Sequence, residues 1–533
     1  MKRISLVLLS LSLLTLFSTG PALSSDAETS DGENSKPPFP EERVESEIKE
    51  FQFIGYYFMR SEMSNVAPTN QFLKGQVVGR LFGGNTTRTS ARTSRFSEQR
   101  FLPMITYSPK LFDGWAKMRM SFEFDWTWGD ANYGAGGNFG GAFAGDFVNM
   151  QTQNLFLELR PKRNLFINAG LLRLYDNVRV PYYTFTDHLV YKGYRLALFG
   201  SDATGVGTHW FFAPNQRIKA GAYQLYENNV EEDDDVVLFE VDYERDLDIE
   251  TSGGLSVHYL RDHANGEGGV SILGQGLNSG LSDYNGVFNF DLGGRPYDGD
   301  ILWLGTHWHG DPLLAQGRTG WSGFAFWNTG RVSTAGRDID INGFASNLRL
   351  AHRYGPFKMD QVALDMTYTS GDDDNVSDGT YSGVLTGNNW TAPGAVFFSH
   401  GLYLLLPHGN VVNRFNAAVI DIQNLGYGLE AVSLTASKEL VPNKWLVKTG
   451  FGAGRATNPP DGSNSSFAAI EPNMGVEANL NIRYRMRVFM DLELHAAQLW
   501  LGDFYDSPVV NGDSDSRPRD PWTAFVTLKW IMF

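Results

Sequence analysis

Few residues in this 533-residue sequence have the types and spacing that catalysis requires. Cysteine is absent, which excludes disulfides, zinc–thiolate sites and a cysteine nucleophile. The sequence also lacks a Gly-x-Ser-x-Gly nucleophile elbow and a glycine-rich nucleotide-binding loop. We therefore expect no enzyme, no catalytic residue and no cofactor.

Two kinds of residue cluster suit a metal ion. His307 and His309 are two residues apart, so their imidazoles lie on the same face of a strand and could bind a metal ion. The sequence offers no third ligand, so we favour the interpretation that they are polar aromatic residues at a membrane interface. The carboxylate runs at 231–235 and 372–374 suit Ca²⁺ or divalent-bound lipopolysaccharide, and they also suit a solvated acidic loop. The stretch DDDNVSDG matches a calcium loop only in part, so we assign no metal ligand.

A larger set of charged residues alternates with apolar residues. Rings of charge select ions in channels, and a lining of both signs favours hydrated polar solutes. The same charges would fill a plugged barrel if they paired across strands. We predict that the pore is lined by Lys117, Arg119, Glu123, Asp125, Glu158, Arg217, Lys219, Glu240, Asp242, Arg349, Arg353, Asp365, Lys448, Glu477, Arg483, Asp491 and Glu493.

Strict alternation predicts extended strands. In WAKMRMSFEFDWTW, residues 115–128, methionine and aromatic side chains occupy one face, and lysine, arginine and acidic side chains occupy the other. Such a strand faces an apolar medium on one side and water or charge partners on the other. Residues 476–484 and 488–495 repeat the pattern, and a tight link around Arg485 to Arg487 predicts a hairpin.

A soluble β-sandwich would also alternate, with its apolar side chains inward. Two features favour a barrel instead. The strands are about 10 to 14 residues long, which matches a tilted bilayer crossing. Short links such as 160–164 and 213–216 alternate with long ones such as 370–424. We predict an all-β, transmembrane antiparallel β-barrel of about 18 strands (roughly 16 to 20), with short periplasmic turns and long extracellular loops.

The strands can be counted back from the C-terminus. The earliest is either Phe53 to Met63 or Phe72 to Phe82. Within the long link, the stretch at 411–426 carries apolar residues at three- and four-residue steps, so we favour a short helix over a strand there. The other strands are expected near 99–107, 115–128, 151–160, 164–174, 206–213, 216–226, 236–245, 252–260, 300–309, 320–330, 341–354, 357–369, 428–439, 444–455, 473–484, 487–500 and 523–533.

The last strand, TAFVTLKWIMF, ends on Phe533 without a polar tail. Barrel closure requires this strand to pair with the first, so that no sheet edge meets lipid. Phe533 shares its face with Phe525, Thr527, Lys529 and Ile531, and the opposite face is more apolar, so the lipid-facing side stays open. We expect the barrel-assembly machinery to recognise this terminal strand.

The N-terminus is typical of a secreted protein. Lys2 and Arg3 precede an apolar run and small residues, which predicts a signal peptide at 1–24; a short membrane anchor is the less favoured alternative. The acidic, proline-bearing stretch 25–50 predicts a flexible periplasmic lead-in. The barrel itself is expected to span 51–533. No later segment approaches the roughly 20 apolar residues of a membrane helix.

The sequence resembles outer-membrane porins of the alginate-export family. The similarity is carried by LFLELRPKRNLFINAGLLRLYDN, LDMTYTSGDDDNVSDG and NLGYGLEAVSLTASKELVPNKWLVKTGFG, and it extends over roughly residues 53–533. The resemblance implies an eighteen-stranded barrel with a charged lumen that passes an anionic polysaccharide. The arginine-rich hairpin of the family is reduced to Arg173 in INAGLLRL.

Together these features predict an outer-membrane channel for passive diffusion or export of hydrophilic solutes, among them anionic or saccharide solutes. The expected partners are outer-membrane lipid, lipopolysaccharide and small hydrophilic solutes. The net charge of −16 disfavours nucleic acid. Two alternatives remain, a barrel that sheathes a secreted electron-transfer cytochrome and an outer-membrane lipid hydrolase. The sequence leaves the oligomeric state open.

Overall fold

The structure is a computed structural model, and it describes residues 50–532 with internal gaps. The predicted signal peptide and nearly all of the predicted lead-in lie outside the described residues, as does Phe533. The gaps fall at 69–77, 83–86, 129–148, 175–176, 181–201, 227–234, 265–289, 291, 293–294, 375, 386–400, 407–414, 420–422, 460–470 and 513–516.

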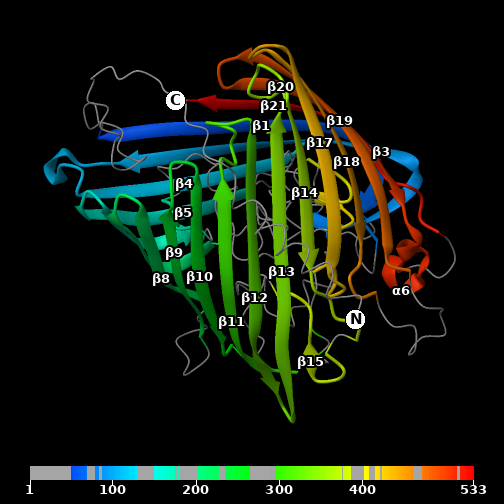
Figure 1. Cartoon of the computed structure of the whole chain (residues 1–533), viewed down its shortest axis with the longest axis horizontal. Helices are drawn as coiled ribbons and strands as arrows, with labels where there is room; N and C mark the ends of the chain where they lie inside the picture. Colours follow the sequence, from blue (N-terminus) through cyan, green and yellow to red (C-terminus); the bar gives the residue numbers. More distant parts are fainter. Residues whose placement is uncertain are drawn as a thin grey trace. The chain divides into compact units, whose positions relative to one another are not determined.

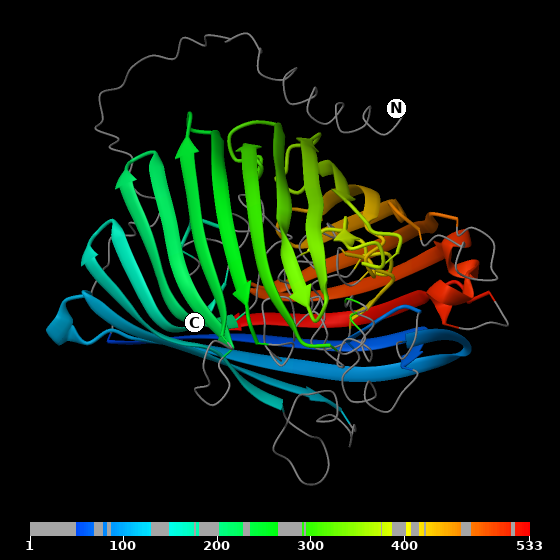
Figure 2. The same cartoon turned by 90° about the horizontal axis from the view of Figure 1, so that it is seen from below.

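Eighteen antiparallel strands close into a ring within the described residues (Figure 1). The ring consists of β1 (Phe51–Pro68), β3 (Thr87–Tyr107), β4 (Ala116–Thr127), β5 (Asn149–Lys162), β6 (Leu165–Arg173), β7 (Asp202–Ala213), β8 (Gln216–Tyr226), β9 (Val236–Asp246), β10 (Thr251–Asp262), β11 (Tyr297–Gly310), β12 (Thr319–Thr334), β13 (Arg337–Arg353), β14 (Gln361–Thr369), β17 (Leu429–Val441), β18 (Trp445–Arg455), β19 (Asn473–Arg487), β20 (Met490–Leu501) and β21 (Trp522–Met532). Figure 2 shows the strands tilted around the ring. The predicted barrel and its strand count are confirmed.

The ring is closed by β1, which pairs with β21 on one side and with β3 on the other. The β1–β21 register runs from Gly55 opposite Met532 to Ser64 opposite Thr523. The first predicted alternative, Phe53 to Met63, therefore supplies the opening strand. Closure leaves every ring strand with two neighbours, which satisfies the backbone polar groups that lipid cannot.

The two ends of the barrel differ. At one end the strands are joined by short turns, such as those between β7 and β8 and between β19 and β20. Both Phe51 and Met532 lie at this end. At the other end most connections are long, the tight β12–β13 turn being an exception. We call these the short-turn end and the long-loop end. Outer-membrane barrels place short turns in the periplasm and long loops outside the cell.

The barrel wall is apolar outside and polar inside. On β9, Phe239 and Val241 are 47% and 46% exposed, whereas the intervening Glu240 and its neighbour Asp242 are each 1% exposed. A soluble sandwich would show the reverse pattern. Exposed tryptophans lie at both ends, among them Trp210 and Trp445 near the short turns and Trp128 and Trp500 near the long loops. An apolar band flanked by aromatic residues is the surface of an outer-membrane β-barrel.

The last strand turns its less apolar face inward. Phe525 and Thr527 are buried at 2% and 0% exposure, while Val526 and Trp530 are each 41% exposed. The face that carries Phe525, Thr527 and Lys529 therefore points into the barrel. This settles the orientation that the sequence left open.

The helix predicted at 411–426 is wrong over its described part. Phe415–Ala417 form β16, which pairs in parallel with β2 (Val78–Arg80). Backbone N–H groups of Ala418 and Val419 donate to the carbonyls of Leu404 and Leu405, so distant segments replace the hydrogen bonds a helix would make within itself. The hairpin predicted around Arg485 to Arg487 turns slightly later, at residues 488–489.

The remaining elements are small. β15 (Thr380–Tyr381) pairs in parallel with β13, and short helical turns occur at η1 (Lys110–Phe112), η4 (Asp503–Asp506) and α6 (Pro508–Asn511). Among the described residues, no helix has the length and apolar character needed to cross a bilayer.

The outward orientation of Val241 predicts how strongly a charge is tolerated there. We expect Val241→Arg, at the middle of β9, to lower the free energy of unfolding in lipid vesicles by about 2–4 kcal/mol. Leu247→Arg, in the turn after β9, is the matched control and should cost about 0–1 kcal/mol, because it lies at the interface. Equilibrium urea unfolding measures both; equal costs would contradict the assigned membrane position.

Candidate pore lining and internal segments

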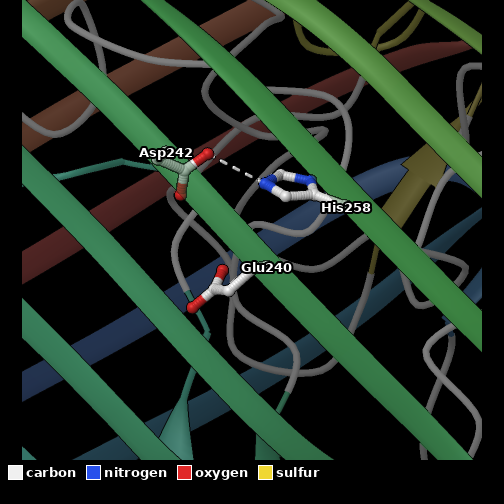
Figure 3. A group of neighbouring side chains, drawn as sticks. All are labelled: Glu240, Asp242 and His258. Carbon is white, nitrogen blue, oxygen red and sulfur yellow. Dashed lines mark hydrogen bonds and ion pairs between the residues drawn. The ribbon is translucent and has the colours of Figure 1, made fainter.

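The inner wall between β8 and β10 carries a compact charged cluster. The Lys219 Nζ lies 2.8 Å from Glu240, and the Tyr223 hydroxyl donates to the Glu240 Oε1 at 2.5 Å. On the next strand His258 Nε2 lies 3.0 Å from the Asp242 Oδ1 (Figure 3). All these side chains are buried, so each charge is neutralised by a neighbour rather than by water.

Glu240, Asp242 and His258 bring three potential metal-ligand atoms within 4.8 Å of one another. Lys219 occupies the same neighbourhood, since its Nζ lies 2.8 Å from Glu240 and 3.9 Å from Asp242. The ammonium group already supplies the positive charge that a cation would bring. The chemistry of this cluster therefore favours an internally neutralised network over a metal site.

A second network lies closer to the short-turn end. Arg217 forms ion pairs with Glu244 and Asp246, and Glu244 also accepts from His307 Nε2 at 2.9 Å. His307 and His309 are both buried, at 2% and 0% exposure. The interfacial position predicted for these histidines is wrong, because Trp308 takes the lipid-facing position and alternation turns both imidazoles inward.

One internal segment follows β6. The Val178 carbonyl accepts from His209 Nδ1 at 2.9 Å, and the Arg179 Nη2 donates to the Glu244 Oε1 at 3.1 Å. His209 and Glu244 both lie in the short-turn halves of their strands. Since β6 ends at the opposite end, residues 177–180 must run back along the barrel interior.

A second internal segment, residues 401–406, lies against β18, β19 and β20. The Tyr403 ring packs on His495 and Phe525, with ring centroids 5.5 and 5.9 Å apart. Leu402, Leu404 and Leu405 are each at most 1% exposed. A third stretch reaches β11, where Trp303 Nε1 donates to the carbonyl of Leu385 at 2.9 Å.

These segments divide the interior along the barrel axis. Many inward residues of the long-loop half are apolar, for example Leu238 on β9, Ile341 on β13 and Leu499 on β20, and they form one buried cluster with residues 402–406. Buried carboxylates also lie in this half: Asp125, Asp262 and Glu477. The inward residues of the short-turn half are charged or polar, for example Glu244 and Arg349. The long-loop half therefore has an apolar core, and the short-turn half has a polar wall.

The predicted lining residues lie on the inner face, but most are buried in ion pairs. Half-buried positions are Arg353, Lys448, Arg483 and Asp491. That these side chains border a water path stays a prediction. The buried members are Lys117, Arg119, Glu123, Asp125, Glu158, Arg217, Lys219, Glu240, Asp242, Arg349, Asp365, Glu477 and Glu493.

Several inward charges were not predicted. The Arg60 side chain pairs with Glu62 at 3.0 Å and with Glu98 at 2.8 Å, and all three are buried. Alternation with Met59, Ser61 and Met63 is the signal that could have identified Arg60 and Glu62. Arg179 had no such signal, because it lies in a loop.

The acidic loop after β14 satisfies its carboxylates internally. Asp372 accepts from Ser382 N at 2.8 Å, and Asp374 accepts from the Ser377 hydroxyl at 2.5 Å. Burial raises the pKa of Asp372, whereas hydrogen bonds from Ser377 and from the Asp378 backbone outweigh burial and hold the pKa of Asp374 below its usual value. Most of the run at 231–235 lies outside the described residues.

Comparison with known proteins adds a distant likeness. No family model and no curated protein matches the chain. Among solved structures, the outer membrane protein OprD from Pseudomonas aeruginosa is 10% identical, with 90% of this chain and 93% of that chain covered and a TM-score of 0.45. OccK11 (OpdR) from the same organism is 13% identical, with 90% and 96% covered and a TM-score of 0.44. OccAB4 from Acinetobacter baumannii is 10% identical, with 90% and 98% covered and a TM-score of 0.42. The function must therefore be argued from the chain itself.

The buried pairs predict unequal costs of charge removal. The Arg119 Nε lies 2.7 Å from Glu158, with both side chains largely buried, so we expect Glu158→Gln to destabilise the barrel by about 3–5 kcal/mol. Asp340→Asn breaks the ion pair between Asp340 and Arg331, which are 3.0 Å apart and whose side chains are 64% and 58% exposed. This substitution should lower the free energy of unfolding by at most about 1 kcal/mol. Urea unfolding in vesicles compares them; a small cost for Glu158→Gln would contradict a neutralised interior.

Proposed function

We propose that this protein is a channel of the bacterial outer membrane that lets hydrophilic solutes pass by diffusion. The observation that carries the proposal is the closed eighteen-strand ring with an apolar outer face and charged inner face. A barrel of 16–18 strands is wide enough to leave an aqueous channel, whereas about eight strands are filled by side chains. Catalysis is not part of the proposal.

The solute class follows from the polar wall of the short-turn half. Cationic and anionic side chains share that wall, and the predicted lining residues there that keep some exposure are Arg353, Lys448, Arg483 and Asp491. A wall of both signs offers hydrogen bonds to a hydrated solute while imposing modest selection by charge. A polar solute, including a saccharide or an anionic one as in alginate export, matches this wall better than an apolar solute.

The sheath alternative is less favoured because this chain fills part of its own interior. Residues 177–180 and 401–406 occupy space that an enclosed partner would need. The lipid-hydrolase alternative has no specific support from the described contacts. Contact with outer-membrane lipid and lipopolysaccharide, and recognition of the last strand by the assembly machinery, are further parts of the proposal.

Planar-bilayer recording of the purified full-length chain tests the proposal. We expect stepwise currents, because each inserted barrel adds one aqueous path. The same preparation should not hydrolyse labelled phospholipid. Heat-modifiable electrophoretic mobility would establish that the barrel is folded; a folded preparation that stays electrically silent, or that cleaves lipid, would contradict the proposed function.

A further inference from the structure

Glu477 on β19 binds the backbone of an internal segment. Its Oε1 accepts from the N–H of Tyr403 at 2.7 Å. Its Oε2 accepts from the N–H groups of Leu404 and Leu405 at 2.8 and 2.7 Å. One wall carboxylate therefore holds three consecutive peptide groups of residues 401–406.

The Glu477 carboxylate is buried, and its main partners are the peptide groups of residues 403–405. The side chain is fully buried, at 0% exposure. Within the described part of the chain, no Lys, Arg or His lies at ion-pair distance from it, in contrast to Glu240 and Glu244. The Asn479 amide NH₂ also donates to Oε1, at 2.9 Å. Burying a carboxylate without a cation is costly, and here the peptide dipoles of the segment offset that cost.

The wall beside Glu477 is shaped to seat the same segment. Gly450, Gly452 and Gly454 alternate on β18 and point inward. A Cβ at Gly452 would lie 2.6 Å from a Leu402 methyl carbon, and a Cβ at Gly450 would lie 3.0 Å from the Gly401 carbonyl oxygen. A Cβ at Gly454 would lie 3.3 Å from a Leu405 methyl carbon. A side chain at any of the three positions would therefore crowd the segment, and we call the three glycines the glycine track.

The seated segment is also joined to the rest of its loop. The N–H groups of Ala418 and Val419 donate to the carbonyls of Leu404 and Leu405 at 2.7 and 3.0 Å. Both edges of this backbone are thus occupied, one by the Glu477 carboxylate and the other by residues 418–419. The unit is a folded part of the interior and lies within its apolar core.

We propose that residues 401–406 are a gate seated on the glycine track and that Glu477 is its latch, a positioning residue that sets the width of the conducting path. This inference rests on the proposed channel function. Removing one latch oxygen should release the segment from the wall and widen the path in the long-loop half.

Thiol labelling tests the latch without requiring conduction. The chain has no native cysteine, so Leu404→Cys supplies a single buried probe. In Glu477→Gln, an amide NH₂ replaces one carboxylate oxygen. Because the NH₂ group is a donor, it cannot accept from the backbone N–H that faces it, and at least one charge-assisted hydrogen bond to residues 403–405 is lost. Because such a bond is worth about 1.5–3 kcal/mol, we expect a water-soluble maleimide to react about tenfold faster or more than in the parent.

Two variants control this measurement. Asp360→Asn removes a buried carboxylate charge that also accepts from a backbone N–H, that of Glu439 at 2.9 Å, but Asp360 lies in the β13–β14 turn and has no described hydrogen bond to residues 401–406, so labelling should stay at the parent rate. Gly452→Ala leaves Glu477 intact and crowds Leu402, so labelling should accelerate. Heat-modifiable mobility verifies folding of each variant. Unchanged labelling in folded Glu477→Gln and Gly452→Ala would overturn the latch.

Single-channel recording then tests the gate. We expect Glu477→Gln to show larger or longer openings than the parent and Asp360→Asn to show the same openings as the parent. If labelling accelerates while a conducting parent and Glu477→Gln pass equal current, the segment is latched but is no gate, which overturns the proposal. If labelling accelerates and both proteins are electrically silent, the proposed channel function fails while the latch stands.

Discussion

The fold depends on one pairing, the antiparallel contact between β1 and β21. A strand edge in lipid would leave a row of peptide groups without partners, and each such group costs several kcal/mol. The register from Gly55 opposite Met532 to Ser64 opposite Thr523 joins the two ends of the chain's sheet and removes both edges. Because the ring is closed, alternate side chains of every strand must face either lipid or the interior.

The interior resolves this requirement differently in its two halves. In the short-turn half, ion pairs such as Arg119–Glu158 and Lys219–Glu240 neutralise charges that are withdrawn from water. In the long-loop half, inward residues such as Leu238 and Leu499 require an apolar partner, and the internal segments provide it. The barrel therefore has an apolar outer surface and also contains an apolar core, which is formed by inward wall residues and residues 402–406.

Alternation along the sequence predicts the wall well. It places β8 at 216–226, where the structure has Gln216–Tyr226, and it turns Glu240 and Asp242 inward. It fails where distant segments meet. Residues 415–417 pair with 78–80, a contact that no local periodicity encodes, so the helical spacing at 411–426 misleads. Alternation also says which side of the wall Glu477 faces but not that residues 403–405 cover it.

The inside-out arrangement of the wall can be measured on a single strand. Nitroxide probes at Phe239, Glu240, Val241 and Asp242, each introduced through a single cysteine, report collisions with lipid-soluble oxygen and with a water-soluble nickel complex. The structure predicts oxygen collisions that are high at 239 and 241 and low at 240 and 242, with a period of two residues. A flat profile, or maxima at 240 and 242, would contradict a barrel that turns its apolar face to lipid.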